Sequence, residues 1–158
     1  MHTYSGFITN LKNNEVFVFG SNFGGFHGAG AAGFASFGVT GNQWRRFGYG
    51  SKPDGWKGKW AVKGVGEGLQ QGADGWSYAL PTVNRPGFPL TKPEIKVGIY
   101  RLYRTAAKYP KWRFLVAYAA SGRNLNGYTS QNMADMFSAA TPPSNIIFQD
   151  HFSSLLSF

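Results

Sequence analysis

The stretch Glu15–Gly33 reads EVFVFGSNFGGFHGAGAAG, and the architecture of the chain follows from it. Its first part, Val16 to Phe19, is a continuous apolar run, which is typical of a strand covered on both faces. The alanines that follow, together with Phe34 and Phe37, predict a helix from His27 to about Gly38. A buried strand, a glycine-rich turn and a helix in this order indicate an α/β layer.

The glycines between Phe19 and Gly33 predict a binding site for phosphate. Without a Cβ, a glycine lets backbone N–H groups approach a ligand closely, and the start of a helix offers unpaired donors and a positive dipole end. Glycines inside a helix each cost about 1 kcal/mol relative to alanine, and a ligand would explain why they are kept. A tight strand-to-helix turn is the structural alternative. We expect the segment Phe19–Gly33 to hold a phosphate-bearing nucleotide.

The remaining pattern alternates strands and helices. Helices are predicted at Lys92–Lys108, where Thr91 and Glu94 have capping-box spacing, and at Ser130–Ser138, capped by Thr129; strands are predicted at Trp76–Leu80, ended by Pro81, at Trp112–Ala119 as a central strand, and at Asn145–Phe148 as an edge strand. Residues 41–75 read as long loops around one extended piece, Lys59–Val65. The alternation predicts one domain, residues 1–158, with a three-layer α/β/α fold.

A second candidate ligand loop, Ala119–Tyr128, leaves the carboxyl end of the predicted central strand. Ligands of open α/β sheets lie at that edge. Arg123 could pair with a phosphate, Asn124 and Asn126 could bond ribose or phosphate oxygens, and Tyr128 could border a sugar. An ordinary Asn-Gly turn with a solvated arginine is the alternative.

Composition narrows the function classes. The chain has 158 residues, no cysteine and a formal charge of +9, so we expect neither disulfides nor thiolate chemistry, and we expect phosphate-bearing partners. No apolar run approaches the roughly 20 residues of a membrane helix, and the first residues lack a secretory signal, which predicts a cytoplasmic protein without a membrane partner. The acidic residues are dispersed, so no metal site and no cofactor are expected.

Two other sequence signals favour different sites. Gly28 to Gly33 matches G-x-G-x-x-G, the dinucleotide-binding motif of Rossmann folds, and Asp54 lies about where such a fold places its ribose-binding acid. The glycines of a Rossmann fold follow the strand at once, however, whereas here seven residues separate Phe19 from His27. His27 could act as a general base, although a histidine at a helix start more often assists the cap or bonds a ligand oxygen.

Several motifs together resemble the macrodomain-like ADP-ribose-binding family of bacteria and phages. The first ligand loop of that family is matched by Val18-Phe19-Gly20-Ser21-Asn22, then Gly25, then His27-Gly28-Ala29-Gly30-Ala31-Ala32. Its short strand that enters the pocket is matched by Trp76 to Thr82, and its next strand with the second ligand loop is matched by Phe114 to Tyr128. Its closing strand is matched by Pro143 to Ile147. The second loop is bulkier and more polar than is usual in the family.

This resemblance implies a macrodomain-like α/β/α sandwich with a mixed central sheet, in which two loops clamp the diphosphate of ADP-ribose or a relative. The ligand-binding residues it implies, together with those favoured by the loop chemistry above, are Gly20, Ser21, Asn22, Gly25, His27, Gly28, Gly30, Ala31, Thr82, Ser121, Gly122, Arg123, Asn124, Asn126, Gly127 and Tyr128.

Three functions remain open at this point. The first is a binding protein without catalytic residues that sequesters a cyclic or conjugated ADP-ribose signal, as a phage anti-defence sponge acting in the host cytoplasm would. The second is an ADP-ribosyl hydrolase, in which Asn22 positions the distal ribose and His27 or a bound water acts. The third and least favoured is nucleic-acid binding through the basic residues from Arg45 to Lys63, with Trp44, Trp56 and Trp60 for stacking.

Overall fold

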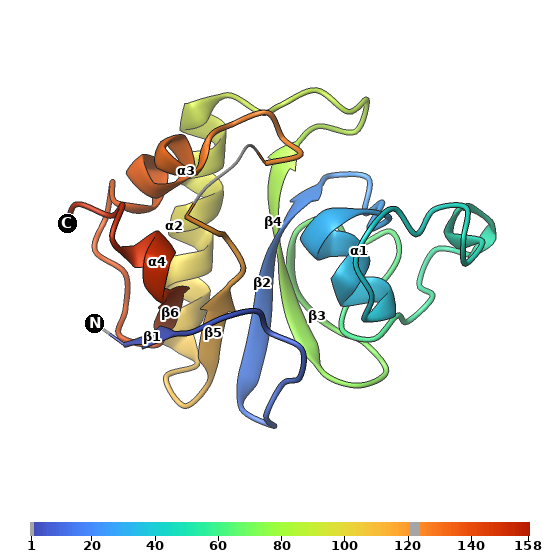
Figure 1. Ribbon diagram of the computed structural model, residues 1–158, viewed down its shortest axis with the longest axis horizontal. Helices are drawn as coiled ribbons and strands as arrows, with labels where there is room; N and C mark the ends of the chain where they lie inside the picture. The colour runs from blue at the N-terminus through green and yellow to red at the C-terminus, as the bar shows by residue number, and fades with distance from the viewer. Residues whose placement is uncertain (1, 121–123) are drawn as a thin grey trace.

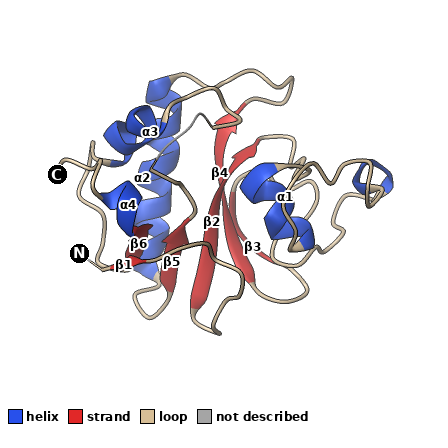
Figure 2. Ribbon diagram, in the orientation of Figure 1, coloured by secondary structure: helices blue, strands red, loops and turns tan. Residues whose placement is uncertain are grey.

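The chain folds around one mixed, mostly parallel sheet with helices on both faces (Figures 1 and 2). A computed structural model describes residues 2–120 and 124–158. The six strands, in the spatial order β1-β6-β5-β2-β4-β3, are β1 (Thr3–Tyr4), β2 (Glu15–Asn22), β3 (Gly68–Gln71), β4 (Trp76–Val83), β5 (Arg113–Val116) and β6 (Ile146–Gln149). Only β3 runs antiparallel to its neighbour. The predicted α/β class and the mixed sheet are confirmed.

Strand β2 is central because both of its faces are apolar. Val16 and Val18 face a core shared with α2 (Lys92–Lys108), α3 (Ser130–Phe137) and α4 (Asp150–Ser153). Phe17 and Phe19 face the opposite side, where α1 (Gly30–Phe37) covers them. Side chains alternate along a strand, so one uninterrupted apolar run supplies two cores.

The helices differ in whether a side chain accepts hydrogen bonds from the backbone N–H groups of the first turn. Thr91 at α2 and Thr129 at α3 each form a complete capping box, as the sequence predicts. Gln149 caps the short α4 through a hydrogen bond from the backbone N–H of Phe152. Helix α1 begins three residues later than predicted, and its N-cap residue, Ala29, has no side chain that can accept a hydrogen bond. The first turn of α1 is therefore left without a side-chain cap.

Several predicted boundaries were wrong, for physical reasons. Lys59–Val65 is not extended; the short strand of this region is β3 at Gly68–Gln71. Pro81 does not end β4, which continues to Val83. The last residue of β4 that pairs with β3 is Ala79, so β4 has no partner on that side at Pro81, and the missing N–H of proline is tolerated there. Strand β6 is not an edge strand, since β1 pairs outside it in parallel. A strand of two residues leaves no pattern that a sequence can reveal.

The long segment between α1 and β3, residues 41–67, has little regular structure but is well packed. The Trp60 side chain is fully buried, with its ring centroid 4.9 Å from that of Phe17 and 5.7 Å from that of Phe34. The Lys63 ammonium is also buried and donates hydrogen bonds to the backbone carbonyls of Gly50 and Lys52. The segment is thus a folded part of the domain that is fastened to the sheet by an aromatic side chain.

None of the helices in the described part of the chain is long and apolar enough to span a membrane.

Trp60→Ala should lower the free energy of unfolding by about 3–5 kcal/mol, because the substitution leaves a large cavity between α1 and the sheet. Phe7→Ala is the matched control, since the Phe7 side chain is 92% exposed and its loss should change stability by less than about 0.5 kcal/mol. Urea unfolding of both variants measures the difference. Equal stability of the two variants would contradict the packing described for Trp60.

Candidate functional site

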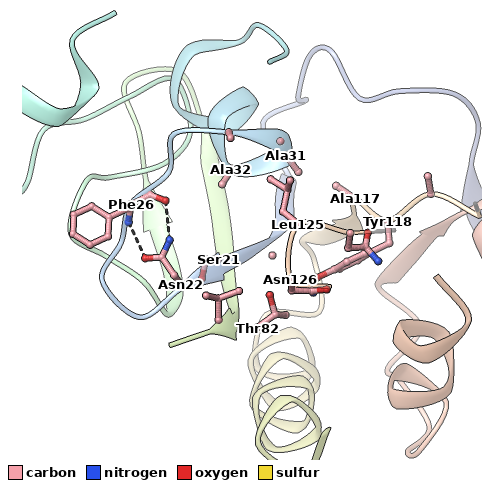
Figure 3. A pocket seen from close by; sticks show the side chains of 16 residues that line it. Ser21, Asn22, Phe26, Ala31, Ala32, Thr82, Ala117, Tyr118, Leu125 and Asn126 are labelled. Atoms are coloured by element: carbon pink, nitrogen blue, oxygen red, sulfur yellow. Dashed lines mark hydrogen bonds between the residues drawn. The ribbon is translucent and has the colours of Figure 1, made fainter. Parts of the chain in front are cut away.

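A cavity of about 490 Å³ opens at the carboxyl ends of β2, β4 and β5, which is the edge of the sheet where ligands of α/β proteins bind (Figure 3). Three segments line it: the end of β2 with the loop into α1, the end of β4, and the chain that follows β5. The lining residues are Gly20, Ser21, Asn22, Phe26, Ala29, Gly30, Ala31, Ala32, Thr82, Val83, Ala117, Tyr118, Ala119, Asn124, Leu125 and Asn126.

One wall of the cavity is the amino-terminal end of α1. The first bond of the helix runs from the Gly33 N–H to the Ala29 carbonyl at 2.9 Å, so the N–H groups of Gly30, Ala31 and Ala32 precede the ladder. No acceptor for these three groups is found among the described residues. The first turn also contains no acidic residue. Unpaired donors and the positive end of the helix dipole therefore face a cavity of ligand size, which suits an anion.

The loop between β2 and α1 is held in shape by the side chain of Asn22. Its amide donates to the Phe26 carbonyl at 2.9 Å and accepts from the Phe26 N–H at 3.0 Å, as Figure 3 shows. The Ser21 hydroxyl is likewise engaged, because it donates to the carbonyl of Gly66. A Cβ at Gly66 would lie 2.2 Å from the Asn22 carbonyl oxygen, so only glycine fits there. Asn22 and Ser21 thus shape the first loop, and each keeps only part of its hydrogen-bonding capacity for a ligand.

Thr82, Tyr118 and Asn126 lie on the other side of the cavity (Figure 3). The Tyr118 side chain is 5% exposed, and its hydroxyl has no hydrogen-bond partner among residues 2–120 and 124–158. This hydroxyl lies 2.7 Å from the position that a Cβ on Gly20 would take, so the strand end must be glycine here. Burial raises the pKa of Tyr118, and the phenol therefore stays protonated and able to donate. A buried hydroxyl with no partner at the edge of a cavity is a suitable donor for a ligand oxygen.

Leu125 overhangs the mouth of the cavity. Its side chain is 80% exposed, yet its Cδ1 atom lies 2.8 Å from the position of a Cβ on Gly30, where φ is +60°. The second loop therefore reaches across to the start of α1. This contact brings the two predicted ligand loops together over one cavity.

Eight of the predicted binding residues meet at this cavity: Gly20, Ser21, Asn22, Gly30, Ala31, Thr82, Asn124 and Asn126. Five others lie away from it: Gly25, His27, Gly28, Gly127 and Tyr128. Tyr128 donates its hydroxyl to the Leu90 carbonyl at 2.6 Å instead of bordering the cavity. Ser121, Gly122 and Arg123 lie outside the described residues.

Part of the lining is not among the residues predicted to bind the ligand. Ala117, Tyr118 and Ala119 directly follow β5 and line the cavity, as do Phe26 and Leu125. The rule that ligands lie at the carboxyl ends of parallel strands could have identified the first three. Phe26 and Leu125 lie within the two predicted ligand loops, but nothing local in the sequence marks these two side chains as lining the cavity, because the folding of the loops decides their positions.

His27 is part of the packing beneath the first loop. Its side chain is fully buried, its Nε2 atom lies 2.9 Å from the Val65 carbonyl, and its ring meets that of Phe19 edge-on at 5.1 Å. Burial lowers the pKa of His27 to about 4, so the imidazole is neutral at pH 7. The structure thus gives this histidine a role in joining the first loop to the segment 41–67.

The polar side chains that line the cavity within the described residues are Ser21, Asn22, Thr82, Tyr118, Asn124 and Asn126, all of them uncharged hydroxyl or amide groups. No cluster of histidine, aspartate and glutamate suited to a metal ion occurs within residues 2–120 and 124–158. Comparisons of the chain with protein-family models, with curated proteins and with solved structures find no match. The chemistry of the site is therefore inferred from its own geometry, which is that of an anion cradle beside hydrogen-bonding groups.

Stability should fall as the pH drops from about 6.5 to 4, because unfolding restores the normal pKa of His27. Within this window the unfolded chain binds a proton that the folded protein excludes, so the free energy of unfolding decreases by up to roughly 3 kcal/mol. His27→Gln should flatten this dependence, measured as the urea midpoint at pH 7.5 and 4.5. His151→Gln is the control, since its side chain is 80% exposed. An unchanged pH profile in His27→Gln would contradict the assignment.

Proposed function

We propose that this protein binds a nucleotide of the ADP-ribose type, with the diphosphate seated on the amino-terminal end of α1. The observation that carries the proposal is the uncapped first turn of α1, whose N–H groups at Gly30, Ala31 and Ala32 face the cavity. The unpaired donors of a first helical turn are normally satisfied by a cap, by water or by a ligand. A phosphate group supplies the negative charge and the acceptor oxygens that this end of the helix requires.

The rest of the cavity suits the sugar part of such a ligand. Its volume, about 490 Å³, lies within the range of pockets that enclose small molecules. The hydroxyls of Thr82 and Tyr118 and the amide of Asn126 can hydrogen-bond ribose oxygens. The formal charge of +9 adds attraction for an anionic ligand at a distance. A nucleotide with two phosphates and a second ribose matches this combination better than an inorganic anion does.

The fold supports the proposed resemblance to macrodomains. Two loops, one after β2 and one after β5, converge on a single cavity at the edge of a mixed six-stranded sheet with helices on both faces. A macrodomain-like three-layer α/β/α sandwich has this arrangement. We therefore take the ADP-ribose family of ligands, including cyclic and conjugated derivatives, as the first to be tried.

We further propose that the ligand is held and not hydrolysed. The lining side chains of the described residues are hydroxyls and amides, which orient a ligand, and the buried His27 is neutral and engaged with Val65. Holding such a nucleotide would remove it from solution, which is the action of a phage-encoded sponge against an ADP-ribose signal of host defence. Mass spectrometry of ligand released after incubation tests this point: intact nucleotide supports sequestration, and a cleaved product supports a hydrolase.

Ala29→Asp should raise stability and abolish binding together. The backbone of Ala29 has φ of −148° and ψ of 164°, the conformation of an N-cap residue, so an aspartate there can bond the free N–H groups. We expect the free energy of unfolding to rise by about 1 kcal/mol and the affinity for ADP-ribose to fall at least tenfold.

Isothermal titration with ADP-ribose and its cyclic derivatives measures the affinity of the wild type and the variant. Ala29→Asn is the matched control, because it caps the helix without adding a charge that repels phosphate. Absence of binding by the wild type to every ADP-ribose derivative would refute the proposed function. Unchanged affinity of Ala29→Asp for ADP-ribose would contradict the placement of the phosphate at the start of α1.

Tyr118→Phe should weaken ADP-ribose binding about tenfold and leave stability unchanged or slightly higher, because the lost hydroxyl has no partner in the part of the chain that the structure describes. Tyr103→Phe is the matched control. The Tyr103 hydroxyl donates to the Phe137 carbonyl at 2.6 Å and lies outside the cavity, so its loss should cost stability and spare affinity. Titration calorimetry and thermal unfolding of both variants separate the two effects. A loss of stability with unchanged ADP-ribose affinity in Tyr118→Phe would show that Tyr118 has only a structural role.

A further inference from the structure

The segment of residues 41–67, here named the basic lobe, stands out from the sheet on the side of α1 (Figure 1). It contains six basic residues and only two acidic ones, Asp54 and Glu67. Glu67 is paired with Arg101, at 3.2 Å, outside the lobe. The lobe therefore carries an excess of positive charge that its own carboxylates do not balance.

Four of the basic side chains are available to a partner. Arg45, Arg46 and Lys57 are exposed and Lys52 is half-buried. None of the four forms an ion pair with a carboxylate of residues 2–120 or 124–158. The other two, Lys59 and Lys63, are engaged, with Asp74 and with backbone carbonyls respectively.

Aromatic rings form a continuous cluster beneath these cations. Ring centroids lie 4.8–6.0 Å apart along the series Phe26, Trp44, Tyr49, Trp56, Phe37 and Phe47. Tyr49 is buried and anchors the cluster, whereas Phe26, Trp44 and Phe47 are each about 40% exposed. Arg46 lies over the ring of Phe47 at 5.2 Å, and Lys52 lies over that of Trp56 at 5.3 Å. Exposed rings and unpaired cations thus occupy one surface.

We propose that the basic lobe binds single-stranded nucleic acid, a function separate from the nucleotide cavity. Unpaired cations neutralise backbone phosphates and release their counterions, and exposed rings stack on unpaired bases without regard to sequence. Acidic polypeptides would satisfy the charges alone and leave the exposed rings of Trp44 and Phe47 unexplained. Double-stranded nucleic acid offers few free base faces. The combination of both features selects a single strand.

The lobe also adjoins the cavity. Phe26 lines the cavity and packs against Trp44 with the ring centroids 5.9 Å apart. The stacking surface is therefore continuous with the cavity mouth through one aromatic contact. A strand bound to the lobe would end beside the cavity without entering it.

The test is fluorescence anisotropy of a labelled twelve-residue oligothymidylate at 50 to 300 mM NaCl. The wild type should bind, and its affinity should fall steeply with salt, with a logarithmic slope of about −2 if three phosphates are neutralised. The double variant Arg45→Glu/Arg46→Glu and the single variant Trp44→Ala should each bind about tenfold more weakly. The control Arg104→Glu/Lys111→Glu makes the same change of charge at exposed positions elsewhere and should bind nearly as well as the wild type.

Three results would overturn the proposal: no binding at 50 mM salt, equal weakening by the lobe and control double variants, or equal competition by polyglutamate and by unlabelled oligothymidylate. Binding of a duplex as strongly as the single strand would also overturn it, because stacking requires unpaired bases. Calorimetry with ADP-ribose separates this proposal from the proposed function, since Arg45→Glu/Arg46→Glu should leave that affinity within about twofold. Thermal unfolding of each variant verifies that the lobe remains folded.

Discussion

The arrangement of the site depends on the N–H groups at the start of α1, for which the described residues provide no acceptor. Helices α2 and α3 are closed by capping boxes, while α1 begins at Gly30 and its N-cap residue, Ala29, has no capping side chain. Giving up a cap costs about 1 kcal/mol of helix stability. A bound anion would restore that stabilisation, which is the physical basis of the proposed ligand site.

The surroundings of α1 keep this helix end open and fixed in position. Asn22 folds the preceding loop onto the backbone of Phe26, and Gly66 allows the basic lobe to pass close to the end of β2. Trp60 then fastens the lobe to the sheet beside α1. The same segment that supports the cavity also presents an exposed basic and aromatic surface, so the two proposed binding sites adjoin each other.

Sequence patterns predicted those features that depend on neighbouring residues. The capping boxes at Thr91 and Thr129 and the apolar run of β2 are local, and the structure places them as expected. Strand β1 was missed because its two residues depend on pairing with β6, far away in the chain. His27 was assigned to the ligand because nothing local indicates that Val65 would engage its ring. The position of Tyr118 directly after β5 could have marked it, but its buried hydroxyl, which has no partner among the described residues, becomes apparent only when the core around it is known.

The most direct measurement is a titration of isotopically labelled protein with ADP-ribose, followed through the amide signals of its backbone. Our account predicts that the largest chemical-shift changes occur at the N–H groups of Gly30, Ala31 and Ala32, with smaller changes at Thr82 and Asn126. Changes confined to the basic lobe, or no changes at ligand concentrations up to the millimolar range, would contradict the placement of a phosphate on α1.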